Sequence, residues 1–238
     1  IAGFQGVTDD DRVATLGRGG SDTSAVAVAA ALEASVCDIY TDVDGVYTTD
    51  PRIVPKAQRI EKISFEEMLE LASLGAKVLQ TRSVEMAMNH NVPVRVLSSF
   101  LKPGEPNPGT IVCSEEEIVE KQVVSGVAYS RDEAKVTLYG VPDKPGISAK
   151  IFSALARAGV NVDMIVQAQA RGPEQANMVF TCTDRDSPIA RDTLESMHEE
   201  ISYERLEVVR DVSKISIVGV GMRSHTGVAE TMFKALYE

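Results

Sequence analysis

The chain has 238 residues, with 24 Lys and Arg against 35 Asp and Glu, which gives a formal net charge of −11 at pH 7. Its 44% apolar and 25% charged residues are typical of a folded protein, and its length fits one large domain or two ordinary ones. The acidic balance argues against nucleic-acid binding, and no apolar run approaches the roughly 18 residues of a membrane span. No secretion signal is recognisable either, so we expect a cytoplasmic protein with no nucleic-acid or membrane partner.

The three cysteines, Cys37, Cys113 and Cys182, are isolated from one another and lie in strand-like segments. Buried free thiols of a reducing compartment are the expected state. The three histidines have no spacing that could build a metal site with these cysteines, so we expect no metal site.

Both ends of the sequence look cut. The chain begins at Ile1 rather than Met, and it stops at Glu238 within a predicted helix. We therefore expect it to be a piece of a longer polypeptide.

The first zone, residues 1–114, alternates β-rich runs with helical ones. The predicted elements in chain order are strand 13–16, helix 21–34, strand 36–41, helix 64–74, helix 76–89 and strand 92–98. Ser64 lies three residues before Glu67, which is the spacing of a capping box, and Gly75 provides a stop signal. Strands that alternate with helices predict an α/β fold with a largely parallel sheet. The proline-rich segment 102–110 predicts a turn-rich surface loop, and the acidic run 115–117 then indicates part of a solvated linker.

The second zone, from about residue 125, contains an internal repeat. Residues 135–141 (KVTLYGV) match residues 214–220 (KISIVGV), and beyond a turn Gly146 matches Gly227. The first copy continues as strand 160–170, strand 177–183, helix 188–200 and strand 203–210. This β-α-β-β-α-β order is the ferredoxin-like arrangement, and the second copy stops after its first helix.

A glycine-rich turn, residues 16–22 (LGRGGSD), lies between a predicted strand and an Ala-rich helix. Glycines let the backbone approach a ligand closely, and the start of a helix favours an anion. Arg18 adds a guanidinium suited to carboxylate or phosphate. The alternative is a structural turn with Ser21 as the N-cap, and the pattern is neither a P-loop nor GxGxxG.

A second polar segment, residues 40–52 (YTDVDGVYTTDPR), follows the end of a predicted strand, where ligands collect in open α/β sheets. Thr41, Asp42, Tyr47 and Arg52 supply a hydroxyl, a carboxylate, a ring for stacking and a cation that can bind phosphate. A solvated loop of turn residues is the alternative. Because both polar segments leave strand ends of one sheet, we favour a binding site.

The run TLGRGGSDTSA, followed by TDVDGVYTTDPR, SFEEMLELASLGAKVL and RSVE, closely resembles the aspartate kinases of the amino-acid kinase family. The repeated units with DKPG and SHTGV resemble the paired ACT domains that follow the kinase domain in those enzymes. The resemblance covers essentially the whole chain. It implies the carboxyl-terminal part of an α/β kinase domain at 1–114 and a linker with the strand that enters the next domain at 115–134. A first ACT domain at 135–211 and a truncated second one at 212–238 would follow.

The resemblance also implies an activity and its sites. Aspartate kinases use ATP with Mg²⁺ to phosphorylate L-aspartate, giving 4-phospho-L-aspartate and ADP, the first step towards lysine, threonine and methionine through diaminopimelate. The implied catalytic residues are Arg18, Ser21 and Asp22, and the implied substrate-binding residues are Arg18, Gly20 and Ser21. The implied nucleotide-binding residues are Thr41, Asp42, Tyr47, Arg52, Lys77 and Val78.

Feedback inhibition by lysine, threonine or both is implied for the ACT-like zone. The implied effector-binding residues are Asp143, Gly146, Ser148, Asn161, Val162, Asp163, Gln167, Val228 and Ala229. An acidic side chain would bind the effector's ammonium group, and amides at a helix start would bind its carboxylate. An Asx turn at Asp143 and a solvated Asp163 are the structural alternative. ACT domains usually pair between subunits, so the resemblance also implies a homo-oligomer.

The sequence departs from the family at its ends. Aspartate kinases begin with a Lys-Phe-Gly-Gly type loop that supplies a catalytic lysine, and these 238 residues contain no such loop. We therefore expect the chain alone to be inactive. The alternative function is a non-catalytic, amino-acid-binding regulatory chain, and another amino-acid kinase is disfavoured because it leaves the repeat unexplained.

Overall fold

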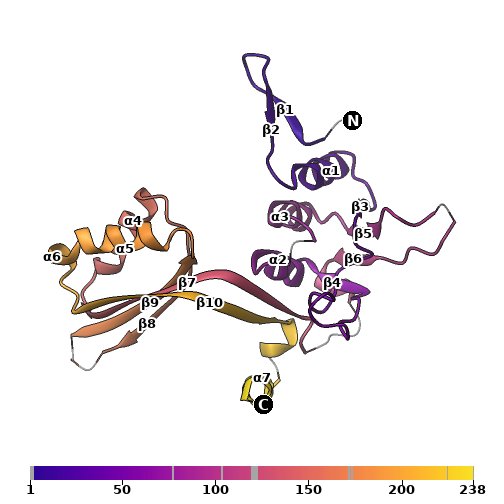
Figure 1. Ribbon diagram of the computed structural model, residues 1–238. Helices are drawn as coiled ribbons and strands as arrows, with labels where there is room; N and C mark the ends of the chain where they lie inside the picture. Colours follow the sequence, from indigo (N-terminus) through magenta and orange to yellow (C-terminus); the bar gives the residue numbers. More distant parts are fainter. Residues whose placement is uncertain are drawn as a thin grey trace. The chain divides into compact units, whose positions relative to one another are not determined.

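The computed structural model describes residues 3–76, 78–102, 104–118, 123–170, 172, 174–223 and 225–237. The chain divides into two compact units, and Figure 1 labels their helices and strands. Unit 1 consists of Ile1–Tyr129 with Ile215–Glu238, and unit 2 is Ser130–Lys214. Among the helices in the described ranges, none has both the length and the apolar character that crossing a membrane requires.

A four-stranded sheet forms the centre of unit 1. Its strands are β3 (Cys37–Thr41), β4 (Lys62–Ser64), β5 (Val94–Ser98) and β6 (Thr110–Cys113), in the order β3-β5-β6-β4. The β3–β5 and β4–β6 pairs are parallel, but β5 and β6 are antiparallel. The sheet is therefore mixed rather than largely parallel. A parallel return would need a long crossover, and the described residues of the proline-rich connection, 99–102 and 104–109, form no helix that could provide one.

Three helices of unit 1, α1 (Gly20–Ala31), α2 (Phe65–Ser73) and α3 (Thr81–His90), lie beside this sheet, with α3 between the other two (Figure 1). Val26 of α1 and Met68 of α2 are almost fully buried in one core with residues of the sheet. The predicted capping box is present, since the Ser64 hydroxyl accepts from the Glu67 N–H and the Glu67 side chain accepts from the Ser64 N–H. Local sequence thus sets where α2 begins, and packing of its apolar face holds it.

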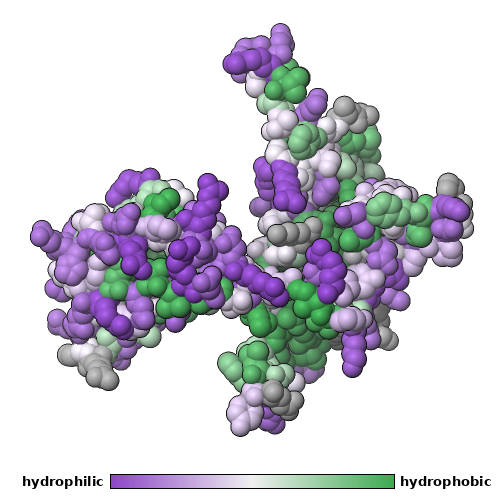
Figure 2. All heavy atoms as spheres, in the orientation of Figure 1, coloured by the Kyte–Doolittle hydropathy of each residue, from purple (hydrophilic) through white to green (hydrophobic). Residues whose placement is uncertain are grey.

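Other predicted boundaries in unit 1 differ from the structure. The strand predicted at 13–16 is β2 (Val13–Thr15), which pairs with β1 (Gln5–Val7) in a hairpin outside the main sheet. Figure 2 shows hydrophilic residues at the tip of this hairpin. The helix predicted from residue 76 begins at Thr81, because Gly75 adopts a positive φ of 117° and Gln80 is an extended N-cap. Strands β4 and β6 are too short for periodicity to reveal.

Unit 2 confirms the predicted β-α-β-β-α-β order. Strands β7 (Gly126–Pro142), β8 (Val162–Gln169), β9 (Gln175–Thr183) and β10 (Arg205–Val218) lie in the order β10-β7-β9-β8, and the start of β7 and the end of β10 belong to unit 1. Helices α4 (Ile147–Arg157) and α5 (Ser187–Ser196) pack together on one face of the sheet (Figure 1), and the short α6 (His198–Ile201) follows α5. Leu155 of α4, Leu194 of α5 and Phe180 of β9 are fully buried in its core. The α/β fold class predicted from the sequence is confirmed.

The internal repeat is visible in the backbone. Gly146 precedes α4 with a φ of 94°, and Gly227 precedes α7 (Val228–Tyr237) with a φ of 91°. In both copies, a strand ends, a glycine turns the chain in the left-handed region and a helix starts. A short helix, η2 (Val220–Arg223), lies between β10 and Gly227. The domain limits 1–114, 115–134, 135–211 and 212–238 stay predictions.

Candidate functional site

The glycine-rich turn 16–22 leads directly into α1. Gly17 and Gly19 adopt positive φ values of 80° and 71°, so both occupy the region that glycine tolerates best. Gly19 is the N-cap of α1, and no side chain caps this end. The first-turn N–H groups and the positive end of the helix dipole therefore lie at this turn, where the Gln80 side chain packs against Gly19. This arrangement suits an anion.

The side chains of this turn differ in burial. Arg18 and Ser21 are exposed, whereas Gly20 is buried and Asp22 is half-buried. Burial raises the pKa of Asp22, although hydrogen bonds from the Ser21 hydroxyl and the Gln80 backbone oppose the shift. The turn thus combines an exposed cation and hydroxyl with a carboxyl group whose charge is less well solvated.

Loop 41–52 begins where β3 ends. The carbonyl oxygen of Thr41 accepts hydrogen bonds from the N–H and the hydroxyl of Ser99, both at 2.8 Å. The Thr41 hydroxyl donates to the Asp42 carboxylate at 3.2 Å. Tyr47 donates its hydroxyl proton to Asp44 at 3.1 Å, and this contact follows burial as a cause of the raised pKa of Tyr47. Hydrogen bonds within the loop and to Ser99, the residue that directly follows β5, therefore fix its conformation.

Arg52 is held by Asp50. Its Nε lies 3.1 Å from Asp50 Oδ1 and its Nη2 lies 2.8 Å from Oδ2, a bidentate pair. The Arg52 side chain is 88% exposed and that of Asp50 only 17%, so the carboxylate anchors a cation that still faces solvent. The hydrogen bond from Arg52 lowers the pKa of Asp50. An exposed, oriented guanidinium is well suited to bind phosphate oxygens.

The structure brings the glycine turn together with the segment that precedes α3. A Cβ atom added to Gly19 would lie 1.6 Å from Cγ of Gln80, and Arg82 donates to the carbonyl oxygen of Leu16 at 3.0 Å. Val78, two residues before Gln80, is half-buried and packs on the core of unit 1. Lys77 lies outside the described residues.

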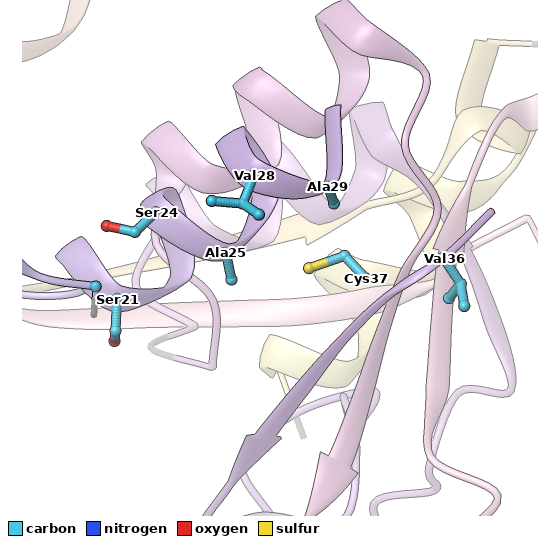
Figure 3. A pocket seen from close by; sticks show the side chains of 8 residues that line it. Ser21, Ser24, Ala25, Val28, Ala29, Val36 and Cys37 are labelled. Atoms are coloured by element: carbon cyan, nitrogen blue, oxygen red, sulfur yellow. The ribbon is translucent and has the colours of Figure 1, made fainter. Parts of the chain in front are cut away.

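A groove of about 480 Å³ lies between α1 and β3 (Figure 3). Its lining is mostly small and apolar and consists of Gly3, Ser21, Ser24, Ala25, Val28, Ala29, Val36 and Cys37. Ser21, one of the predicted site residues, lies on its wall. Among the described residues, those that line the groove supply hydroxyls but no charged side chain.

Three of the predicted effector residues meet in unit 2. Gln167 of β8 donates to Asp143 Oδ1 at 3.3 Å, and Ser148 of α4 donates to Gln167 Oε1 at 3.5 Å. Asp143 and Ser148 lie on either side of Gly146 in the chain, and Gly146 is the N-cap of α4, which has no side-chain cap. A carboxylate, an amide and a hydroxyl therefore face one helix start, as binding of a zwitterion requires.

Asp163 has a different partner. Its carboxylate accepts from Lys214, which also lies 3.4 Å from Glu133. Partial burial opposes the charge of Lys214, but the two carboxylates outweigh this effect and raise its pKa. Asp163 is thus engaged in an ion pair that the sequence did not indicate.

The remaining predicted effector residues lie elsewhere. Asn161 is exposed just before β8, and Val162 is half-buried against the core of unit 2. Val228 and Ala229 form the first turn of α7, in unit 1.

Two residues of unit 1, Asp50 and Glu67, were not identified from the sequence as residues that support the candidate site. Asp50 had a local signal, because an Asp that accepts from the N–H two residues later is a common turn element, here at 2.9 Å. Glu67 was predicted only as part of the capping box. Its further contacts come from segments distant in sequence, and no local pattern reports them.

Comparisons with known proteins fit these features. Residues 1–98 match the amino acid kinase family, and residues 135–201 match the ACT domain. An aspartate kinase of Pseudomonas putida is 54% identical over 239 residues, covering 99% of this chain and 56% of the relative. The chain is an aspartate kinase homologue. It spans about half the length of the curated relatives it matches.

Two solved structures extend the comparison of this aspartate kinase homologue. Escherichia coli aspartokinase III in complex with aspartate and ADP, in the R-state, is 34% identical with a TM-score of 0.77, covering 98% of this chain and 51% of that one. The same enzyme with lysine and aspartate, in the T-state, is 36% identical with a TM-score of 0.67, covering 91% and 47%. The resemblance inferred from the sequence motifs is thereby confirmed.

Proposed function

We propose that this chain is part of an aspartate kinase that transfers the terminal phosphoryl group of ATP to the β-carboxylate of L-aspartate, giving 4-phospho-L-aspartate and ADP. One observation carries the proposal, namely the 54% identity to an aspartate kinase that extends over 99% of the chain. A similar solved enzyme binds aspartate and ADP, which supports both the acceptor and the nucleotide. The reaction would start the diaminopimelate route to lysine, threonine and methionine.

The nucleotide would bind at loop 41–52. Thr41 and Asp42 at the end of β3 offer polar contacts, Tyr47 offers a ring face, and Arg52 offers phosphate binding. Lys77 and Val78 belong to the same proposal. Its physical support is the exposed Arg52 guanidinium, which Asp50 holds in a fixed orientation. Phosphoryl transfer depends mostly on positioning and charge neutralisation, so an oriented cation is the expected part.

The aspartate and the transferring phosphoryl group would bind at the glycine turn. The N–H groups at the start of α1 and the Arg18 guanidinium would stabilise negative charge on equatorial oxygens, and the backbone of Gly20 belongs to the same proposal. Ser21 would hydrogen-bond the substrate, and Asp22 would orient Ser21. Mg²⁺ usually binds through one or two carboxylates together with substrate phosphates, so we propose that it arrives with ATP and neutralises phosphate charge.

Regulation would act through the ACT domain. We place lysine, threonine or both at the cluster of Asp143, Ser148 and Gln167 around Gly146, and retain Asn161, Val162, Asp163, Val228 and Ala229 as further contacts. The solved relative with bound lysine supports an amino-acid effector. A homo-oligomer built through ACT domains remains part of the proposal.

The test uses the complete reading frame that contains this sequence. With ATP and L-aspartate, hydroxylamine should trap the acyl phosphate as a hydroxamate, and ADP should form in equal amount. The 238-residue chain alone should give neither product, because it contains no Lys-Phe-Gly-Gly loop. Equal hydroxamate formation from L-glutamate, or ADP release without any hydroxamate, would contradict the proposed acceptor.

A further inference from the structure

Glu67 of α2 is a buried carboxylate, with 6% of its surface exposed. Its Oε2 accepts from the N–H of Ser64 at 3.3 Å and from the Ser64 hydroxyl at 3.2 Å. Its Oε1 accepts from the hydroxyl of Ser125 and from the N–H of Val220 at 3.1 Å. A capping box requires only the bonds around Ser64, so the other two need a separate explanation.

One additional donor lies just before β7, and the other lies just after β10. Ser125 immediately precedes β7, and Val220 follows β10 in η2. The residue before β7 also bonds to the end of β10, since the Ser125 N–H donates to the Val218 carbonyl at 2.8 Å. One carboxylate thus joins helix α2 to two segments that lie 58 and 153 residues away in the chain.

The first residues of β7 in turn support loop 41–52. The Val127 N–H donates to the carbonyl oxygen of Thr48 at 2.7 Å, and the Tyr129 hydroxyl lies 3.5 Å from Asp50 Oδ2. Gly126 lies close beneath the loop, because a Cβ atom there would be 3.2 Å from the Thr48 oxygen. The segment held by Glu67 is therefore the one on which the loop rests.

We propose that Glu67 is a positioning residue for loop 41–52: it fixes the start of β7, and β7 fixes the loop that carries Asp50 and Arg52. The inference rests on the proposed nucleotide role of this loop. Glu67 touches no reacting group. Its effect passes through Ser125, at the start of β7, to the backbone of Thr48.

A carboxylate satisfies the groups at this site better than an amide would. All four groups that face Glu67 are donors, and a carboxylate has two oxygens that only accept. A glutamine in its place would keep one oxygen and turn an NH₂ group towards donors on the other side. Each side has one backbone N–H and one serine hydroxyl; the hydroxyl can rotate to accept from the NH₂ group, but the buried N–H would lose its bond. Ser125 would also exchange a hydrogen bond to a charged oxygen for a weaker neutral one, which weakens the attachment of α2 to β7.

The experiment measures steady-state kinetics of the complete enzyme, varying ATP and L-aspartate separately. Glu67→Gln should raise KM for ATP about five- to tenfold. It should change kcat and KM for aspartate less than about twofold, since the chemical step is left in place. Glu66→Gln is the matched control, because Glu66 is the exposed neighbour on the same turn of α2 and should leave all three constants unchanged.

If Glu67→Gln folds poorly, a less disruptive variant and its matched control test the same proposal. Ser125→Ala deletes one donor to Glu67 and should raise KM for ATP about two- to threefold. Ser73→Ala deletes an exposed hydroxyl that bonds within α2, and it should change nothing. Arg52→Ala distinguishes a failure of the proposed nucleotide loop from a failure of the positioning role of Glu67. If Arg52→Ala leaves KM for ATP unchanged, the proposed nucleotide loop is wrong; if only Glu67→Gln and Ser125→Ala leave it unchanged, the positioning role is wrong.

Discussion

Replacing Gly19 with alanine should loosen helix α1 far more than the same change at Gly17, two residues earlier. Both glycines have positive φ, so each alanine pays the cost of the left-handed region. For Gly17→Ala the backbone strain is nearly the whole cost, because the added Cβ atom would contact only Arg82 Nη2, at an ordinary distance of 3.9 Å. We expect Gly17→Ala to destabilise the segment by about 1 kcal/mol.

At Gly19 the new methyl group has no room. Its carbon would lie 1.6 Å from Cγ, 2.5 Å from Cδ and 2.8 Å from Cβ of Gln80, so the whole side chain must move. Overpacking of this kind usually costs about 1–3 kcal/mol. Added to the backbone cost, it gives an expected loss of about 2–4 kcal/mol for Gly19→Ala.

Hydrogen exchange of the α1 amides, followed by mass spectrometry, measures this loss locally and is not averaged over the two units. Gln80→Ala should restore part of the protection in the Gly19→Ala background, because it removes Cγ and Cδ but leaves Cβ. Equal protection of α1 in Gly17→Ala and Gly19→Ala would refute the close packing of the glycine turn against Gln80.

Three further outcomes follow from other parts of the fold. Burial raises the pKa of the Cys182 thiol from 9.0 to about 11, so at pH 8 iodoacetamide should alkylate it about a hundredfold more slowly in the native chain than in urea. The hydrogen bond from Arg210 lowers the pKa of Asp184 below 3.8, so the pair stabilises unit 2 above that pH and loses its effect as the pH falls through the native pKa. The difference in unfolding midpoint between wild type and Asp184→Asn should therefore be present at pH 7 and vanish in strong acid. In the complete enzyme, Gln167→Ala should keep uninhibited turnover but shift the inhibition midpoint for lysine, threonine or both about tenfold or more upward, and an unchanged midpoint would place the effector elsewhere.

Features that depend on neighbouring residues could be predicted from the sequence. The capping box joins Ser64 and Glu67, which are three positions apart, and its two hydrogen bonds follow from local geometry. The repeated strand, glycine and helix also determine a backbone path, and Gly146 and Gly227 adopt nearly the same φ. Periodicity over the longer elements then sufficed to predict the α/β class and the β-α-β-β-α-β order.

Features that depend on tertiary contacts could not be predicted in this way. The ion pair of Asp163 with Lys214 spans 51 residues, and the contact of Glu67 with Val220 spans 153. Neither has a signal in the residues around it, since such pairs depend on how distant segments pack. The antiparallel β5–β6 pair was missed for a related reason, because β6 has only four residues and shows no clear periodicity.

Hydrogen exchange of the complete enzyme with and without ADP examines the proposed nucleotide site itself. ADP should slow exchange in loop 41–52 and at the start of α1, where backbone amides face the proposed phosphate positions. The exposed hairpin β1–β2 provides an internal reference that should not change. Protection confined to other segments, with loop 41–52 and the glycine turn exchanging as fast as in the free enzyme, would contradict the proposed site.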